Sequence, residues 1–169
     1  MIIDLASVGK NPKPIELAFG PEEINLDEGT RLTTKAVFTG DISRDGSKTH
    51  VRGYIDAEVE TDCFRCLDPV PKAIDIEFED IFVDAVDEPR DDEIELGEDE
   101  LDISLITGDE IDMADVVREQ VILATTETVY CKEDCKGLCP KCGGNRNLID
   151  CKCDDNEIDP RWSALKNLR

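Results

Sequence analysis

Six cysteines lie close together between residues 131 and 153, and the sequence carries eight in all. In a reducing compartment disulfides are rare, and clustered thiols more often bind metal. A metal-binding module is therefore predicted, with a disulfide-linked extracellular domain as the alternative. The first four cysteines are separated by three, three and two residues, and the full set is Cys131, Cys135, Cys139, Cys142, Cys151 and Cys153.

The sharpest element within this set is Cys139-Pro140-Lys141-Cys142-Gly143. Two thiolates separated by two residues can bind one tetrahedral ion from a tight turn, and a following glycine permits the backbone conformation that such a turn needs. Zinc is the expected ion because it accepts four thiolates and has no redox chemistry of its own. Its binding free energy would also stabilise a segment that contains few apolar residues.

The two remaining ligands of a tetrahedral site have two candidate sources. Cys151 and Cys153 follow after a loop of eight residues, and Cys131 and Cys135 precede at a spacing of three. Spacing alone does not choose between them. We favour the set Cys139, Cys142, Cys151 and Cys153. In that case Cys131 and Cys135 are either free or complete a second site with Cys63 and Cys66.

The pair Cys63-Phe64-Arg65-Cys66 allows three interpretations. The two thiols could belong to that second metal site, form a redox pair, or remain free. A thioredoxin-like redox motif needs a βαβ context, whereas this pair follows a run of strands expected to be antiparallel. Redox catalysis is therefore disfavoured, and metal binding and free thiols stay open.

Apolar residues alternate with polar ones in the segments on both sides of the first cysteine pair, which predicts half-buried strands. The expected strands are 32–42, 51–59 and 73–83, with short ones at 2–5 and 15–19. Asp45-Gly46 predicts a hairpin turn between the first two. In 73–83 the apolar pattern changes parity near Asp80, which indicates a bulge or a change of burial.

A helix is expected from Asp112, as its N-terminal cap, to about Thr126. Its apolar stripe should pack on the sheet, and it consists of Met113, Val116, Val117, Val121 and Ala124. The acidic segment 84–100 reads as a loop, and a short terminal helix should begin near Asp159. We predict an α+β fold, an antiparallel β-sheet or partial barrel packed by one long helix, in a domain at 1–130. A cysteine-rich metal module and the terminal helix occupy 131–169.

Charge is distributed unevenly along the sequence. The net charge is -22; residues 131–169 hold eight basic and seven acidic residues, which is +1 and leaves -23 for residues 1–130. The first part should repel nucleic acid and anionic membranes. An acidic surface also keeps a protein soluble without any special partner. Nucleic-acid contact is expected only at the cysteine-rich end, from Lys136, Lys141, Arg146 and Arg161.

No enzymatic constellation is visible in the sequence. The single histidine, His50, falls on the polar face of a predicted strand, and no phosphate-binding loop is present. No apolar run is long enough to span a membrane. No basic region precedes the short apolar stretch at the start, so no signal peptide is expected. We expect a cytoplasmic protein that is not an enzyme and has no small-molecule substrate.

Four segments resemble the YceD family, the large ribosomal RNA subunit accumulation proteins, and they occur in that family's order. They are CFRCLDPV at 63–70, DMADVVREQVIL at 112–123, CKEDCKGLCPKCGGNRNLIDCKC at 131–153 and DPRWSALKNL at 159–168. The resemblance implies a bacterial cytosolic protein needed for normal accumulation of large-subunit ribosomal RNA, without established enzymatic activity. Arg146 departs from the family pattern, which commonly has an apolar residue there. It could loosen the metal loop or add a phosphate contact.

The resemblance leads to a functional expectation, a non-enzymatic ribosome biogenesis factor that promotes accumulation or processing of large-subunit ribosomal RNA. Its partner would be the RNA precursor itself or a basic ribosomal protein or assembly factor. The charge distribution slightly favours a protein partner over the RNA precursor. The alternatives from other classes are a thiol and zinc switch that responds to oxidation, and a general protein-binding module.

Overall fold

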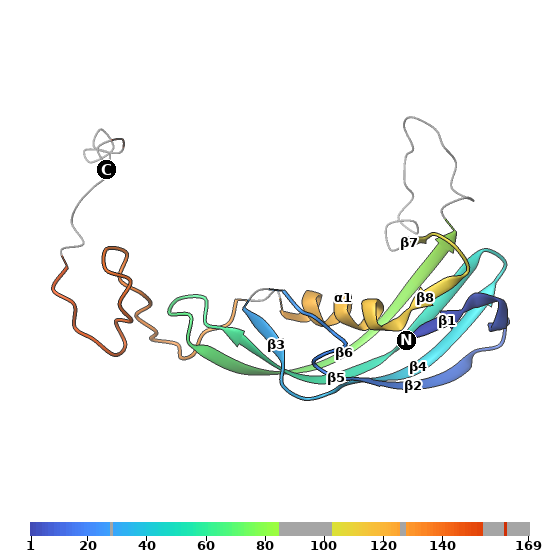
Figure 1. Cartoon of the computed structure of the whole chain (residues 1–169), viewed down its shortest axis with the longest axis horizontal. Helices are drawn as coiled ribbons and strands as arrows, with labels where there is room; N and C mark the ends of the chain where they lie inside the picture. Colours follow the sequence, from blue (N-terminus) through green and yellow to red (C-terminus); the bar gives the residue numbers. More distant parts are fainter. Residues whose placement is uncertain (28, 85–102, 126–127, 154–160, 162–169) are drawn as a thin grey trace.

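The computed structural model of the chain describes residues 1–27, 29–84, 103–125, 128–153 and 161. It contains a curved sheet, a two-stranded sheet and one helix (Figure 1). The elements are β1 (Ile2–Asp4), the 3₁₀ turn η1 (Leu5–Ser7), β2 (Lys13–Phe19), β3 (Thr30–Leu32), β4 (Ala36–Asp45), β5 (Lys48–Asp62), β6 (Pro69–Asp84), β7 (Ile103–Ile106), β8 (Glu110–Asp112) and α1 (Met113–Thr125).

The large sheet has the order β2-β4-β5-β6-β7, and β3 also pairs with β5. All of its pairs are antiparallel except β6 with β7. The predicted hairpin is confirmed, since Asp45 pairs with Lys48 and Gly46 has a φ of 65°. The strand expected at 32–42 is divided instead: β3 ends at Leu32 and β4 begins at Ala36. Both pieces pair with β5, which is long enough to hold them end to end.

The β5–β6 ladder is the longest element and carries the first cysteine pair at one end. Its register runs without interruption from Lys48 opposite Val83 to Asp62 opposite Pro69. At ~3.3 Å per residue the ladder spans about 50 Å. The predicted bulge near Asp80 is wrong and the change of burial is correct, because Phe82 is buried and its neighbours are only partly so. The turn between the two strands holds Cys63 and Cys66.

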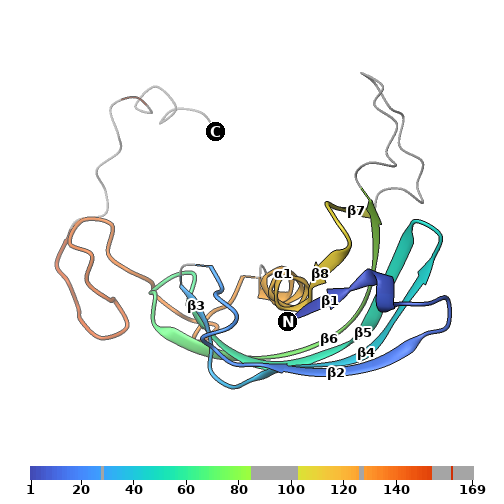
Figure 2. The same cartoon turned by 45° about the vertical axis from the view of Figure 1, so that its right-hand side comes forward.

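Helix α1 lies in the hollow of the curved sheet (Figures 1 and 2). As predicted, Asp112 caps it, since its Oδ1 accepts a hydrogen bond of 3.0 Å from Ala114 N. At the other end Lys72 Nζ donates to Ala124 O at 2.8 Å, where a cation offsets the negative end of the helix dipole. The predicted apolar stripe faces the sheet, with buried side chains at Met113, Val116, Val117 and Val121.

Strands β7 and β8 were not expected from the sequence. β8 pairs with β1 in the small sheet, and β7 pairs with the far end of β6. The mixed α and β fold is confirmed, and the finer description as a partial barrel stays a prediction. The expected acidic loop at 84–100 and the terminal helix from Asp159 lie almost entirely outside the described residues. No helix in the described part of the chain is long and apolar enough to cross a membrane.

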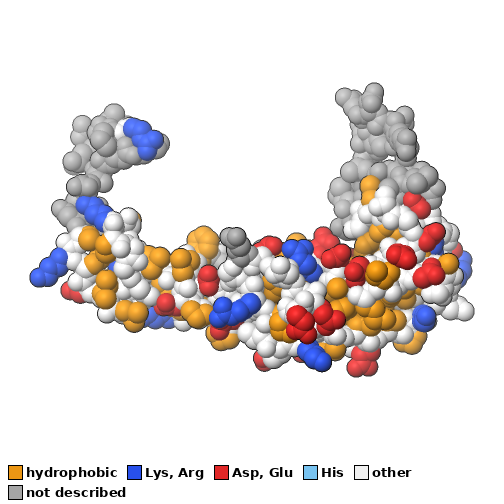
Figure 3. Space-filling model, viewed as in Figure 1, with side chains coloured by type: hydrophobic (Ala, Val, Ile, Leu, Met, Phe, Trp, Pro, Cys, Tyr) orange, Lys and Arg blue, Asp and Glu red, His pale blue; other side chains and the backbone are white. Residues whose placement is uncertain are grey.

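The outer face of the sheet, which points away from α1, is strongly acidic. Figure 3 shows acidic side chains gathered over the part of the molecule that holds the sheet. Strand parity places ten carboxylates on the outer face, and they are Glu16, Asp41, Asp45, Asp56, Glu58, Glu60, Asp62, Asp75, Glu77 and Glu79.

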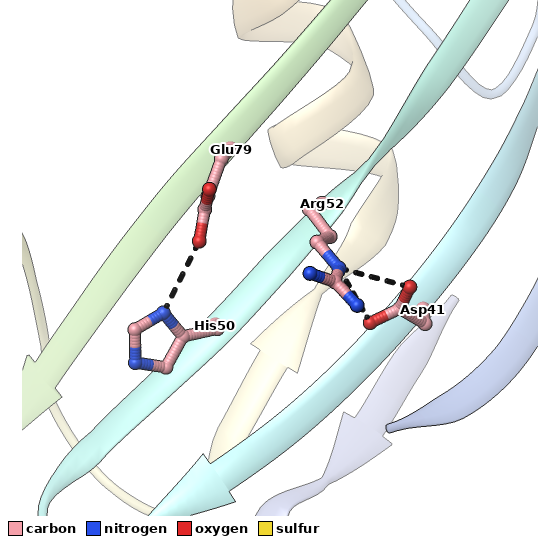
Figure 4. A network of polar contacts seen from close by, with 4 residues as sticks. All are labelled: Asp41, His50, Arg52 and Glu79. Atoms are coloured by element: carbon pink, nitrogen blue, oxygen red, sulfur yellow. Dashed lines mark hydrogen bonds and ion pairs between the residues drawn. The ribbon is translucent and has the colours of Figure 1, made fainter.

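A small polar network on this face includes the single histidine (Figure 4). Arg52 Nε donates to both oxygens of Asp41 at 3.0 Å, and His50 Nδ1 lies 3.5 Å from Glu79. The predicted position of His50 on the polar face of its strand is thus confirmed. Next to this network, a hydrogen bond to Asp75 raises the pKa of Tyr54 to about 12, since the neutral hydroxyl is the donor.

Candidate metal centres

The first cysteine pair lies on a tight turn, residues 63–68, that we call the first knuckle. Leu67 N donates to Cys63 O at 2.9 Å, and Cys63 N donates to Asp68 O at 2.8 Å. Leu67 has a φ of 60°, in the left-handed region. Both cysteines are buried, with exposed fractions of 0% for Cys63 and 3% for Cys66. The turn therefore points its two thiols to the interior.

The second knuckle, residues 139–144, repeats this hydrogen-bond pattern. Gly143 N donates to Cys139 O at 2.8 Å, and Cys139 N donates to Gly144 O at 2.9 Å. Gly143 has a φ of 71°, as expected for a glycine after the second cysteine of such a turn. The two knuckles thus share one backbone conformation, and a leucine in the first occupies the position of the glycine in the second.

The eight thiols form two groups of four, and the sulfurs within each group lie within 4.8 Å of one another. Each group could hold a metal ion. In the first cluster Cys63 Sγ is 3.8 Å from Cys135 Sγ, and Cys66 Sγ is 3.5 Å from Cys131 Sγ. The first cluster is Cys63, Cys66, Cys131 and Cys135, and the second is Cys139, Cys142, Cys151 and Cys153.

The structure therefore brings together the four cysteines that the sequence analysis favoured, and it joins the remaining four across the expected domain boundary. Cys131 and Cys135 lie with the first knuckle, away from the alternative grouping with Cys139 and Cys142. The clusters differ in burial. Three of the four cysteines in the first are buried, whereas Cys139 is the only buried cysteine of the second.

Arg65 fixes the cysteine-rich segment against the first knuckle. Its guanidinium lies 4.3 Å from the ring centroid of Tyr130, and its Nη1 donates to Glu133 O at 3.2 Å and Cys135 O at 3.1 Å. Its own carbonyl accepts from Leu138 N at 3.0 Å. These contacts align both cysteines of the first knuckle with their partners in 131–135. In Figure 1 the cysteine-rich segment accordingly lies beyond the β5–β6 turn, at the end of the sheet.

Two asparagines that the sequence analysis did not select support the first cluster. Asn147 Nδ2 donates to Cys135 Sγ at 3.3 Å, and its Oδ1 accepts from Lys136 N at 3.0 Å. Asn145 Nδ2 donates to Asp68 Oδ2 at 2.9 Å, and that oxygen also accepts from the Cys66 thiol at 3.3 Å. The Asn-x-Asn sequence directly after the second knuckle is the signal that could have identified them.

Arg146, between these asparagines, contacts the other cluster. Its Nη2 lies 3.9 Å from Cys139 Sγ. An open hollow beside the second cluster is lined by Lys136 and Arg146, together with Cys151 and Cys153. Of the four predicted nucleic-acid contacts, two therefore share one hollow, whereas Lys141 and Arg161 are not part of its lining.

The protein environment holds some of these thiols near ionisation. Burial alone would raise the pKa of Cys63, but backbone N–H groups, among them that of Cys131 at 3.3 Å, lower it to about 6. N–H groups of Cys142 and Lys141 lower the pKa of Cys139 to about 6. Each cluster thus has a preformed thiolate position, which suits metal binding because ligand cysteines must lose their protons.

Other members of the clusters retain their protons in the absence of a cation. Burial raises the pKa of Cys66, and a hydrogen bond with Cys142 raises that of Cys153 to about 12. Four thiolates repel one another unless a positive ion lies between them. A bound metal would therefore displace these protons, so the affinity of both clusters should rise with pH.

Comparison with known proteins shows which family the chain matches. A family model described as "Large ribosomal RNA subunit accumulation protein YceD" matches residues 51–169, a range that contains both knuckles. An uncharacterized protein of Mycobacterium tuberculosis is 27% identical over 190 residues, which cover 99% of this chain and 81% of that one. The uncharacterized protein YlbN of Bacillus subtilis is 29% identical over 162 residues, with 87% and 88% covered.

A plant relative carries a more explicit name. The chloroplastic large ribosomal RNA subunit accumulation protein YCED homolog 1 of Arabidopsis thaliana is 43% identical over 60 residues. That match covers 36% of this chain and 19% of the plant protein. No solved structure matches the chain.

Proposed function

This chain belongs to the YceD family, and from that premise we propose that it is a non-enzymatic ribosome biogenesis factor that promotes accumulation or processing of large-subunit ribosomal RNA. The observation that carries the proposal is the extent of the family match, which spans the first knuckle, the helix and the whole cysteine-rich segment. Relatives named for ribosomal RNA give no support to the alternative of a redox switch.

Zinc is the ion that we propose for both clusters. Four sulfurs at about 2.3 Å from a tetrahedral zinc ion lie about 3.8 Å from one another. The two sulfur distances of 3.8 and 3.5 Å in the first cluster are consistent with that geometry before any ion adjusts it. With four cysteines at each ion no position remains for a substrate, so the zinc would be structural.

The first zinc site would set the position of the module relative to the sheet. Its ligands come from the β5–β6 turn and from residues 131–135, so one ion would connect segments that are far apart in the chain. Metal binding that requires a folded site adds its free energy to folding. The second site would then organise residues 139–153 alone. On this basis we retain the boundary between a domain at 1–130 and a module at 131–169.

The partner that we favour is a basic ribosomal protein or assembly factor in the cytoplasm. The carboxylates on the outer face of the sheet disfavour direct contact with RNA there and favour a positively charged protein. A second route is direct contact of the module with the RNA precursor through Lys136, Lys141, Arg146 and Arg161. The hollow that Lys136 and Arg146 share supports this second route.

Depletion of the protein from cells tests the functional proposal. The ratio of large- to small-subunit ribosomal RNA should fall, and precursors should accumulate. The intact gene should restore the ratio, and a Cys139→Ser, Cys142→Ser variant should not. Ile2→Ala, at a side chain that is 60% exposed, is a matched control that should also restore it. An unchanged ratio with normal precursors in depleted cells would refute the proposed function.

A further inference from the structure

The two knuckles differ at the one position where their shared backbone favours glycine. Gly143 adopts its φ of 71° without cost, whereas Leu67 adopts a φ of 60° with a side chain present. Leu67 is the only non-glycine residue with positive φ in the part of the chain that the structure describes. A glycine there would satisfy the same two hydrogen bonds, so the metal site itself does not require leucine.

Packing inside the molecule does not offset the strain at Leu67, because its side chain is 58% exposed. Phe64, on the same turn, is 73% exposed. Phe64 N donates to Val129 O at 2.9 Å, which places this turn beside Tyr130, itself 39% exposed. We call Phe64, Leu67 and Tyr130 the knuckle patch. Hydrophobic side chains are visible at this end of the molecule in Figure 3.

The knuckle patch is held in place by buried neighbours. The two buried cysteines on either side of Phe64 and Arg65 belong to the first cluster, and the Arg65 side chain lies over the Tyr130 ring. Large apolar side chains that are fixed before binding lose little entropy when a partner covers them. Strained residues that persist in a structure are concentrated at functional sites. Tyrosine and arginine, as in the pair Tyr130 and Arg65, are also enriched among the anchor residues of protein interfaces.

We propose that the knuckle patch is a docking site for a positively charged protein, with Phe64 and Leu67 inserted into an apolar pocket of that partner. The partner's role in ribosome biogenesis rests on the proposed function, whereas the docking site itself does not. Outer-face residues of β5 lead directly to the patch, and Glu58 and Asp62 are exposed there. A basic surface around the partner's pocket would complement them.

The same observations disfavour two other occupants. A second copy of the chain would bring together two molecules of charge -22. Unpaired RNA bases could stack on Phe64 and Tyr130, but the adjacent strand is acidic and would repel the RNA phosphates. A protein partner of opposite charge therefore fits the patch best.

Leu67→Gly separates docking from folding. The variant should leave the thermal unfolding midpoint unchanged or raise it, because the strain is relieved. In cells it should lower the ratio of large- to small-subunit ribosomal RNA toward that of depleted cells. Leu105→Ser, at a side chain of 50% exposure on β7, is the control and should not change the ratio. Full function of Leu67→Gly, or a lowered midpoint, would overturn the proposal.

Crosslinking from the patch identifies the occupant. Photoreactive benzoylphenylalanine in place of Leu67, in intact cells, should form a covalent product with one lysine- and arginine-rich protein. Phe64→Ser should abolish that product, and the same probe at Leu105 should not give it. Products with RNA or with a second copy, or no product, would overturn the proposal. Loss of ribosomal RNA on depletion without this crosslink refutes the docking site alone, whereas the crosslink without any change in ribosomal RNA refutes the proposed function alone.

Discussion

The sheet and the cysteine-rich module depend on different interactions for their stability. In the described residues of the sheet and α1, apolar side chains form one continuous core that includes Phe38, Ile55 and Val121. The described part of the module, residues 131–153, has no comparable core: the buried group where it meets the β5–β6 turn consists of Cys63, Cys66 and Cys135, with Val70 and Leu138 against it. Burial of apolar surface should therefore stabilise the first region, and metal–thiolate bonds the second.

Removal of metal should produce the largest contrast between the regions. A strong chelator under reducing conditions should unfold residues 129–153, because their backbone hydrogen bonds depend on the positions of the thiols. The β4–β5 hairpin should keep its protection. Hydrogen exchange read segment by segment measures both. Equal loss of protection in the sheet, or none in the module, would contradict the separation.

Phe38→Ala should have the opposite effect to metal removal: it should destabilise the sheet and leave the metal sites intact. Phe38 is fully buried and packs 5.7 Å from Phe78, centroid to centroid. Loss of a buried phenylalanine side chain costs about 3–5 kcal/mol. Chemical denaturation should show that loss, while zinc content per folded molecule stays unchanged. A matched control is Ile2→Ala, at an exposed position, which should change the free energy of unfolding by less than about 0.5 kcal/mol.

Substitution of a side chain that contacts the sulfurs should weaken zinc binding at one cluster and leave the other unchanged. Asn147→Ala removes the hydrogen bond to Cys135 Sγ and should weaken zinc binding at the first site by about 10–100-fold. Arg146→Ala removes the contact with Cys139 Sγ and should act on the second site. Competition with a chromogenic chelator measures both affinities. If each variant weakened both sites equally, the clusters would be one coupled unit.

The smallest effect concerns the sheet surface at alkaline pH. The carboxylate of Asp75 favours the neutral Tyr54 hydroxyl, so the raised pKa stabilises the fold fully below the unfolded pKa of about 10. That contribution is lost as pH rises through about 12. Asp75→Asn should lower the Tyr54 pKa toward its ordinary value. Ultraviolet titration in a Tyr130→Phe background measures it, and an unchanged pKa would assign the shift to other neighbours.

Patterns that depend on local geometry were readable from the sequence. Alternation at 51–59, the Asp45-Gly46 turn and the stripe on α1 predicted elements that the structure contains. The cysteine spacings left two groupings open, because the relevant partner of Cys131 lies more than 60 residues earlier. Such a pairing depends on how the β5–β6 turn meets residues 129–138, which no local pattern encodes.

The missed features share a dependence on distant partners. Strand β7 has four residues, too few for a clear alternation, and it exists because it pairs with the far end of β6. Asn145 and Asn147 act through Asp68 and Cys135, which reach them only in the folded chain. The left-handed conformation of Leu67 had no signal either, since leucine disfavours it and only the repeated knuckle hydrogen bonds impose it.

We propose that two separate four-cysteine sites each hold one zinc ion, and native mass spectrometry of protein purified under reducing conditions tests this proposal most directly. Two zinc ions are expected in the intact chain and one in each of two double variants, Cys66→Ser with Cys131→Ser and Cys142→Ser with Cys153→Ser. The first variant should detach the module from the sheet, and the second should not. An intact, fully reduced chain that carries one zinc ion or none would contradict the account.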